Sequence, residues 1–166
     1  MHDPRSESGH HAEARPGGHR HYGRLLLMLG LSFLSMYVLM YAMVDARANV
    51  HPNLNQLYMA GLMTAPMAVI EILLMGAMYP DRKRNALIVG GALVALLGFW
   101  QLIRQQTAIS DRQFLRSMIP HHAGALLMCR EAPIEDPRIQ ALCRSILAGQ
   151  QAEIDQMHAL LEEVSR

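Results

Sequence analysis

The stretch LLLMLGLSFLSMYVLMYAMV, Leu25 to Val44, decides the fold, because none of its residues carries a charge. At a rise of about 1.5 Å per residue, an apolar helix of this length crosses the roughly 30 Å hydrocarbon layer of a membrane. The stretch is too long for the apolar part of a cleaved signal peptide, which has about 7 to 15 residues. We therefore expect an uncleaved membrane-spanning helix over residues 25–44.

Two further apolar segments, residues 57–79 and 86–103, predict a second and a third spanning helix. The chain is 51% hydrophobic and only 17% charged, whereas soluble domains are about 25% charged. The charges that do occur between Leu25 and Ile103 are Asp45, Arg47, Glu71, Asp81, Arg82, Lys83 and Arg84. Residues 25–104 are thus predicted to form a three-helix domain in the lipid bilayer.

Basic residues predict the orientation of these helices, because Lys and Arg near a span resist translocation. The amino tail and the turn before the third helix are richer in them than the first loop and the segment after the third helix. We expect residues 1–24 in the cytoplasm and residues 105–166 in the periplasm, with the chain in a bacterial inner membrane. The tail is rich in His, Gly, Pro and charge, a composition that predicts disorder; its histidines are His2, His10, His11, His19 and His21.

Residues 105–166 predict a hairpin of two helices. Ser110 to Gln113 resembles a capping box at the start of the first helix, and Asp136 with Pro137 suits the start of the second. Pro120 is expected to bend the first helix. A hairpin of roughly 55 residues is below the size at which one core is dependable, so we expect a homodimer or higher oligomer that completes a four-helix bundle.

Soft metal donors recur on this hairpin at helical spacing. The candidate ligands are the thioethers, imidazoles and thiols of Met118, His121, His122, Met128, Met157, Cys129 and Cys143. Thioether and thiolate favour copper(I), imidazole accepts copper in either oxidation state, and magnesium or calcium would require carboxylates. The sequence therefore predicts a copper site in the bundle interior, with copper(I) favoured.

Each donor also has a structural interpretation. The cysteines could be buried thiols, a disulfide across the hairpin or copper ligands; an exported location favours the disulfide if the Cα atoms approach within about 7 Å. His121 and His122 could be a polar pair bonded to backbone, and the methionines could fill the core. These alternatives stay open at the level of sequence.

Glu71 lies near the middle of the second predicted span, where a charge costs at least ~2.5 kcal/mol. It is either functional, as a proton or ion acceptor, or a protonated acid that bonds to a Tyr or Ser of the first helix. Methionines recur around it at four-residue intervals, at Met59, Met63, Met67 and Met75. This pattern supports an alternative function, an oligomeric metal transporter with Glu71 and the membrane methionines on the ion path.

The string from Met118 through Ile119-Pro120-His121-His122 to Met128 resembles the MIPHHxGAxxM core of the domain-of-unknown-function 305 family, and residues 146–157 resemble its second-helix motif. The resemblance implies a ferritin-like, exported or membrane-anchored helical bundle, with some members bound to copper and linked to copper tolerance. It carries over five candidate ligands, and gives two further residues a structural or supporting role. The ligands are Met118, His121, His122, Met128 and Met157; the supporting residues are Gln150 and Glu153. Family members often have two such hairpins in one chain, and this chain has one.

Composition and motifs also exclude functions. A net charge of +1 and no basic run longer than three residues argue against a nucleic-acid partner. No nucleophile with a partnered base, catalytic carboxylate pair or cofactor loop is present, so we expect no enzyme, with a copper-dependent oxidoreductase as the weaker alternative. The expected function is periplasmic copper buffering, storage or tolerance.

Overall fold

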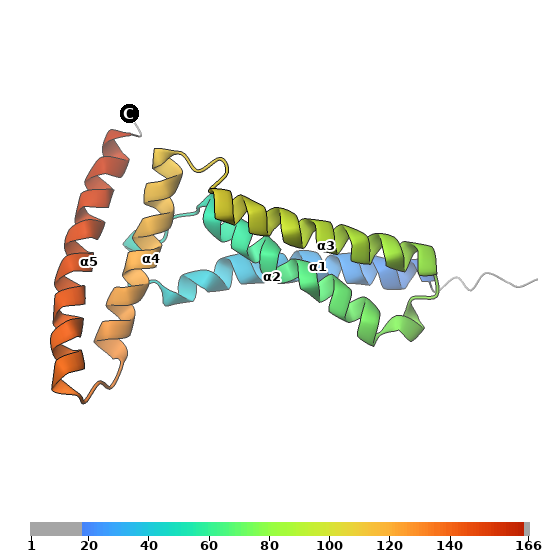
Figure 1. Cartoon of the computed structure of the whole chain (residues 1–166), viewed down its shortest axis with the longest axis horizontal. Coiled ribbons are helices and arrows are strands. Elements are labelled where there is room, and N and C mark those ends of the chain that lie inside the picture. The colour runs from blue at the N-terminus through green and yellow to red at the C-terminus, as the bar shows by residue number, and fades with distance from the viewer. Residues whose placement is uncertain (1–17, 165–166) are drawn as a thin grey trace, which may run out of the picture.

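The computed structural model describes residues 18–164, which are helical without any strand. The α-helices are α1 (Gly18–Leu39), α2 (Leu54–Leu74), α3 (Arg82–Gln105), α4 (Asp111–Glu131) and α5 (Pro137–Glu163). Short 3-10 turns follow α1 and α2, namely η1 (Met40–Met43), η2 (Arg47–Asn49) and η3 (Gly76–Met78). Helices α1 to α3 extend alongside one another, and the α4–α5 hairpin stands across one end of them (Figure 1). The all-α class is confirmed.

Three helices are long and apolar enough to cross a membrane, over Arg20–Met43, Leu54–Leu74 and Arg82–Gln105. The third of these helices is exposed along nearly its whole length, with Ala92 as its buried residue. Leu87 is 75% exposed and Leu97 is 68% exposed, for example. Apolar surface of this extent is unfavourable in water, so these helices need lipid or another apolar surface around them.

The ends of the first two helices differ from the predicted ones. Helix α1 begins at Gly18 rather than Leu25, because Tyr22 belongs to its packed face: the Tyr22 hydroxyl donates to Oδ1 of Asn85 at 2.7 Å, and its ring lies 5.2 Å from that of Tyr79. Helix α2 ends at Leu74 rather than at Tyr79, because residues 75–79 turn to bring Tyr79 into this cluster. Residues 1–17 of the predicted tail, with the disorder expected there, lie outside the described residues.

Helix α2 approaches α3 closely at small residues. A Cβ atom placed on Gly61 would lie 2.4 Å from the ring of Phe99, so any larger residue here would have to displace that ring. Ala60, beside it, is fully buried. Small residues at such crossings let helix backbones approach in membranes.

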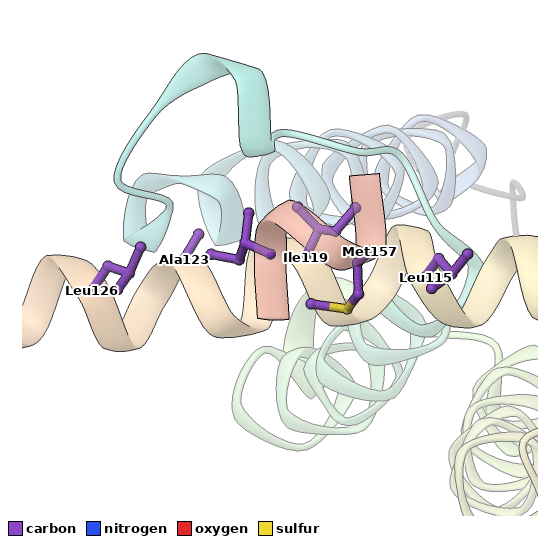
Figure 2. Packing of buried hydrophobic residues seen from close by; sticks show 6 residues of the cluster. Leu115, Ile119, Ala123, Leu126 and Met157 are labelled. Carbon is purple, nitrogen blue, oxygen red and sulfur yellow. The ribbon is translucent and has the colours of Figure 1, made fainter. Parts of the chain in front are cut away.

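The hairpin has its own apolar core. Four residues of α4 at spacings of three and four lie on one helix face and pack with two residues of α5; they are Leu115, Ile119, Ala123, Leu126, Ile154 and Met157 (Figure 2). Val44, which follows η1, packs against the same cluster. The loop between α1 and α2 therefore covers part of the face that we expected a second subunit to cover, and the homodimer stays a prediction.

The hairpin's helix caps are partly as predicted. Asp136 caps α5 and accepts from the backbone N–H of Arg138 at 2.8 Å, as expected. The capping box at Ser110 is wrong: its side chain makes no cap hydrogen bond, and Oε1 of Gln113 accepts instead from the N–H of Leu54 at 3.0 Å. The first N–H groups of a helix lack intrahelical partners, so Gln113 satisfies one at the start of α2. Pro120 lies inside a continuous α4.

Candidate metal centre

His122 is held across the hairpin by both of its ring nitrogens. Nδ1 lies 2.8 Å from the carbonyl oxygen of Met118, one helical turn earlier, and Nε2 lies 2.9 Å from Oε2 of Glu153 on α5. The carbonyl can only accept, so Nδ1 donates to it. The His122 side chain is 13% exposed and that of Glu153 is 56% exposed. A nearly buried imidazole therefore directs Nε2 toward a carboxylate that solvent can reach.

His121 lies beside this pair, and its ring centre is 5.9 Å from that of His122 in an edge-on arrangement. It is exposed, as are Phe114 and Met128, which follow the same row of α4. Helical spacing places the three residues on one row of α4. Within one chain this row faces outward, so the placement of the donors in the interior of a four-helix bundle stays a prediction that depends on the homodimer.

Two of the three methionines face the hairpin core, and the third faces outward. Met157 is buried in the hairpin core, Met118 packs half-buried against that core, and Met128 is 54% exposed. Among residues 18–164, no group of three His, Cys, Asp or Glu side chains is placed to hold a metal ion. One chain thus presents imidazole and carboxylate together near His122, with the Met118 backbone supporting the ring.

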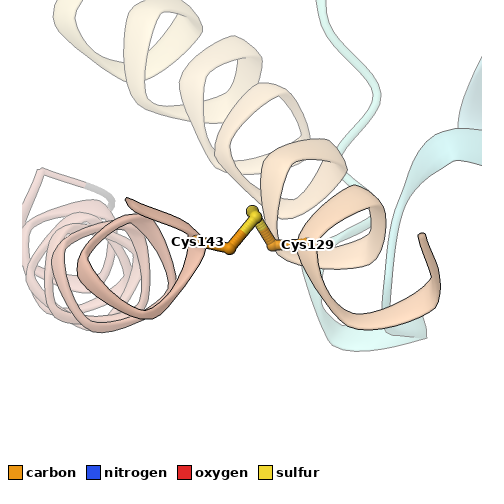
Figure 3. Close-up of a disulfide and its surroundings, with 2 residues drawn as sticks. All are labelled: Cys129 and Cys143. Carbon is orange, nitrogen blue, oxygen red and sulfur yellow. A yellow bond between two sulfur atoms is a disulfide. The ribbon is translucent and has the colours of Figure 1, made fainter. Parts of the chain in front are cut away.

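Cys129 and Cys143 form a disulfide that joins the end of α4 to the start of α5 (Figure 3). Their Cα atoms lie 5.4 Å apart, within the range that the disulfide interpretation required. A metal ion binds the thiolate form of cysteine, which neither residue has in the oxidised chain. The two cysteines are therefore corrected from candidate ligands to a covalent link.

Comparison with known proteins places this hairpin in a family. Residues 99–161 match the family described as "Domain of unknown function (DUF305)". The chain is also 32% identical over 142 residues to "Uncharacterized protein L153" of Acanthamoeba polyphaga mimivirus, an alignment that covers 84% of this chain and 91% of the viral protein. The chain belongs to the family of that viral protein and carries a DUF305 domain. No solved structure matches it.

The DUF305 domain contains all of the predicted ligands, whereas Glu71 lies outside it. Glu71 is in the last turn of α2 rather than mid-span, because that helix ends at Leu74. Its Oε1 accepts from the hydroxyl of Tyr79 at 3.2 Å. One of the two interpretations of Glu71 gave it a hydrogen bond to a Tyr or Ser of the first helix; the bond comes instead from Tyr79, in the turn before α3.

The methionines around Glu71 do not form an internal path within one chain. Met59, Met63 and Met75 are each at least 40% exposed on the surface of the helical unit. Side chains in this position face the surroundings of the chain, as is ordinary for lipid-compatible residues. The geometry of a single chain therefore gives the transport alternative no specific support.

Sequence reasoning did not select a second histidine pair, which joins the DUF305 domain to the loop before α2. The ring centres of His51 and His158 lie 5.3 Å apart. Burial, and then the neighbouring His158 and Arg116, lower the pKa of His51 from its ordinary value. The two residues are far apart in the sequence, and no helical or local spacing relates them. Only the docking of the loop on α5 could reveal the pair.

Proposed function

We propose that this chain is a membrane-anchored copper-binding protein that buffers or stores copper, and not an enzyme. The orientation of His122 carries the proposal. Histidines that bind metals commonly donate their other ring N–H to a backbone carbonyl or carboxylate, which fixes the tautomer. His122 makes this contact through Nδ1 to Met118, which reserves Nε2 for a ligand.

The surroundings of Nε2 support an ion at this position. Oε2 of Glu153 lies 2.9 Å from Nε2, so a carboxylate oxygen stands beside the nitrogen that would bind the ion. His121 supplies a second imidazole beside it. Copper accepts imidazole in either oxidation state, and Met118, whose side chain packs against the hairpin core, would add a preference for copper(I) as a thioether ligand.

The exposed face of the hairpin supports oligomerisation as part of this function. Phe114, Met128 and Leu142 are each at least 50% exposed, which leaves apolar surface on both helices. His121 lies on the same row as two of them. In the proposed homodimer this face meets its copy, and the partner's donors complete the copper shell.

The disulfide supports the proposed location of the hairpin. Disulfides persist in oxidising compartments and are rare in the cytosol. The basic run Arg82 to Arg84 begins α3 at the end of the helical unit away from the hairpin, and such runs stay on the cytoplasmic side. Both observations favour a hairpin on the outer side of the membrane, which in a bacterium is the periplasm.

Copper stoichiometry of the purified full-length protein in detergent tests the proposal. The background chain has alanine at the tail positions His2, His10, His11 and His19, so that loosely held copper does not obscure the result. Replacing both His121 and His122 with alanine should remove one copper ion per chain, and His21→Ala is the matched control. Unchanged stoichiometry in the double variant would contradict the proposal. Met118→Leu, which keeps the side-chain volume, should weaken copper(I) more than copper(II).

A further inference from the structure

The loop between α1 and α2 is fastened to the hairpin by polar contacts. Asp45, whose side chain is 6% exposed, accepts from Arg130 of α4 at 2.8 Å. Asn53 donates through Nδ2 to the carbonyl oxygen of Arg116 at 3.4 Å. These contacts lie on either side of residues 46–52 and hold that stretch against the hairpin.

His51 is fixed within this loop, but its ring is not satisfied. Its carbonyl oxygen accepts from the hydroxyl of Tyr41 at 3.0 Å and from Nδ2 of Asn53 at 2.9 Å. Its Nε2 atom is buried and has no hydrogen-bond partner. A buried polar atom without a partner costs about 1–3 kcal/mol, so its retention calls for an explanation such as a bound ion.

A chain of hydrogen bonds fixes the tautomer of the facing histidine. Asn49, which is 7% exposed, donates through Nδ2 to Oδ1 of Asp45 at 2.8 Å. Its Oδ1 then accepts from Nε2 of His158 at 2.9 Å. Because Nε2 of His158 carries the hydrogen, the Nδ1 atom of the neutral ring keeps its lone pair. Supporting residues of this kind orient the histidines of metal sites.

We propose that His51 and His158 form a copper(I) site between the loop and α5. Two imidazole nitrogens at about 2.0–2.1 Å from one ion place their ring centres just over ~6 Å apart when they are in line across the ion, and about 5 Å apart when they meet at a tetrahedral angle. The observed separation is 5.3 Å. An ion between them gives the buried Nε2 of His51 the partner that it lacks. This site shares no residue with the pair of His122 and Glu153 and does not depend on it.

The charge and number of the donors select the ion. Zinc takes at least three protein ligands, and within the described range 18–164 no third His, Cys, Asp or Glu joins the pair. Copper(I) accepts two neutral nitrogen donors. Arg116 lies close enough to act on His51 electrostatically, and a nearby positive charge disfavours a divalent ion more than a monovalent one.

Anaerobic titration with copper(I) against a chromophoric chelator, in detergent, tests this site. The chain used is the full-length tail-alanine background with His121 and His122 also replaced by alanine, so that the first proposed site is absent. It should bind one copper(I) per chain. His51→Ala and His158→Gln should each abolish that binding. Asn49→Ala should keep the stoichiometry but weaken affinity about 10- to 100-fold, because it loses the orienting hydrogen bond.

The controls separate loss of ligand from loss of fold. His158→Gln retains a side-chain N–H that can reach Asn49, and far-ultraviolet circular dichroism should show unchanged helicity. X-ray absorption of the copper-loaded background chain needs no variant at the site and should report nitrogen ligands without sulfur. Absence of copper from the background chain, sulfur in its shell, or full binding after His51→Ala would overturn the proposal. Equal affinity for zinc would overturn the assignment to a monovalent ion.

Discussion

The disulfide between Cys129 and Cys143 should supply a large share of the hairpin's stability. The two residues are 14 apart in sequence, so they close a loop of about 15 residues, for which loop-closure entropy gives about 3 kcal/mol. The hairpin core that it reinforces has only six buried residues. Replacing both cysteines with serine removes the link and should lower the free energy of opening of α4 and α5 by about that amount.

Hydrogen exchange measured by mass spectrometry, in detergent, reads this change locally. Since about 1.4 kcal/mol corresponds to a factor of ten, amides protected by hairpin opening should exchange about 100-fold faster in the serine variant. Amides of α2 provide the control in the same sample and should keep their rates. An acceleration of less than about fivefold in α5, or an equal acceleration in α2, would refute the reasoning.

Three other changes test the packing and the loop. Gly61→Ala places a Cβ atom 2.4 Å from the ring of Phe99 and should destabilise the α2–α3 pair by about 1–3 kcal/mol in thermal unfolding. The control Gly90→Ala, where a Cβ atom would meet nothing within 4 Å, should leave the stability unchanged. Equal effects of the two variants would contradict the close approach of α2 to α3. Ile154→Ala removes a side chain that is 1% exposed and should cost about 2–5 kcal/mol in urea unfolding of the hairpin; a cost below about 1 kcal/mol would place Ile154 outside the core. The pKa of His51 is lowered by burial and by the neighbouring His158 and Arg116. As pH falls below about 6.5, the unfolded chain therefore binds a proton at this residue before the folded chain does. The free energy of unfolding should decrease over that range. His51→Asn should flatten this dependence, and an unchanged slope would assign it to other groups.

The helices that could cross a membrane were predictable because long charge-free runs have few alternatives. Their ends were not, since they depend on contacts between distant residues. Helix α1 extends back to include Tyr22, which contacts Asn85 and Tyr79. No local sequence pattern predicts those contacts. Glu71 likewise lies at a helix end and not in mid-span, because α2 ends at Leu74 and the hydroxyl of Tyr79 in the following turn donates a hydrogen bond to it.

The candidate site shows a different limit of sequence reasoning. Helical spacing puts His121 and Met128 on one row of α4 with Phe114, but the sequence could not say which face of that helix turns inward. Ile119 and Leu126, each 0% exposed, form the interior instead, because aliphatic burial outweighs the placement of donors. A disulfide was one of three interpretations of Cys129 and Cys143. The register of α4 against α5 brings their Cα atoms to 5.4 Å and so allows the bond.

The loop that carries His51 links the membrane helices to the DUF305 domain, and this connection gives the second proposed site a physical consequence. An ion that requires both His51 and His158 binds only while the loop is docked on α5. Binding must therefore stabilise the docked state, by about 2.7 kcal/mol when free copper(I) is at 100 times its dissociation constant. Hydrogen exchange of residues 44–53 should slow accordingly on copper(I) addition in the background chain. It should not slow in His158→Gln, because that variant keeps the contact with Asn49 but lacks the second nitrogen ligand.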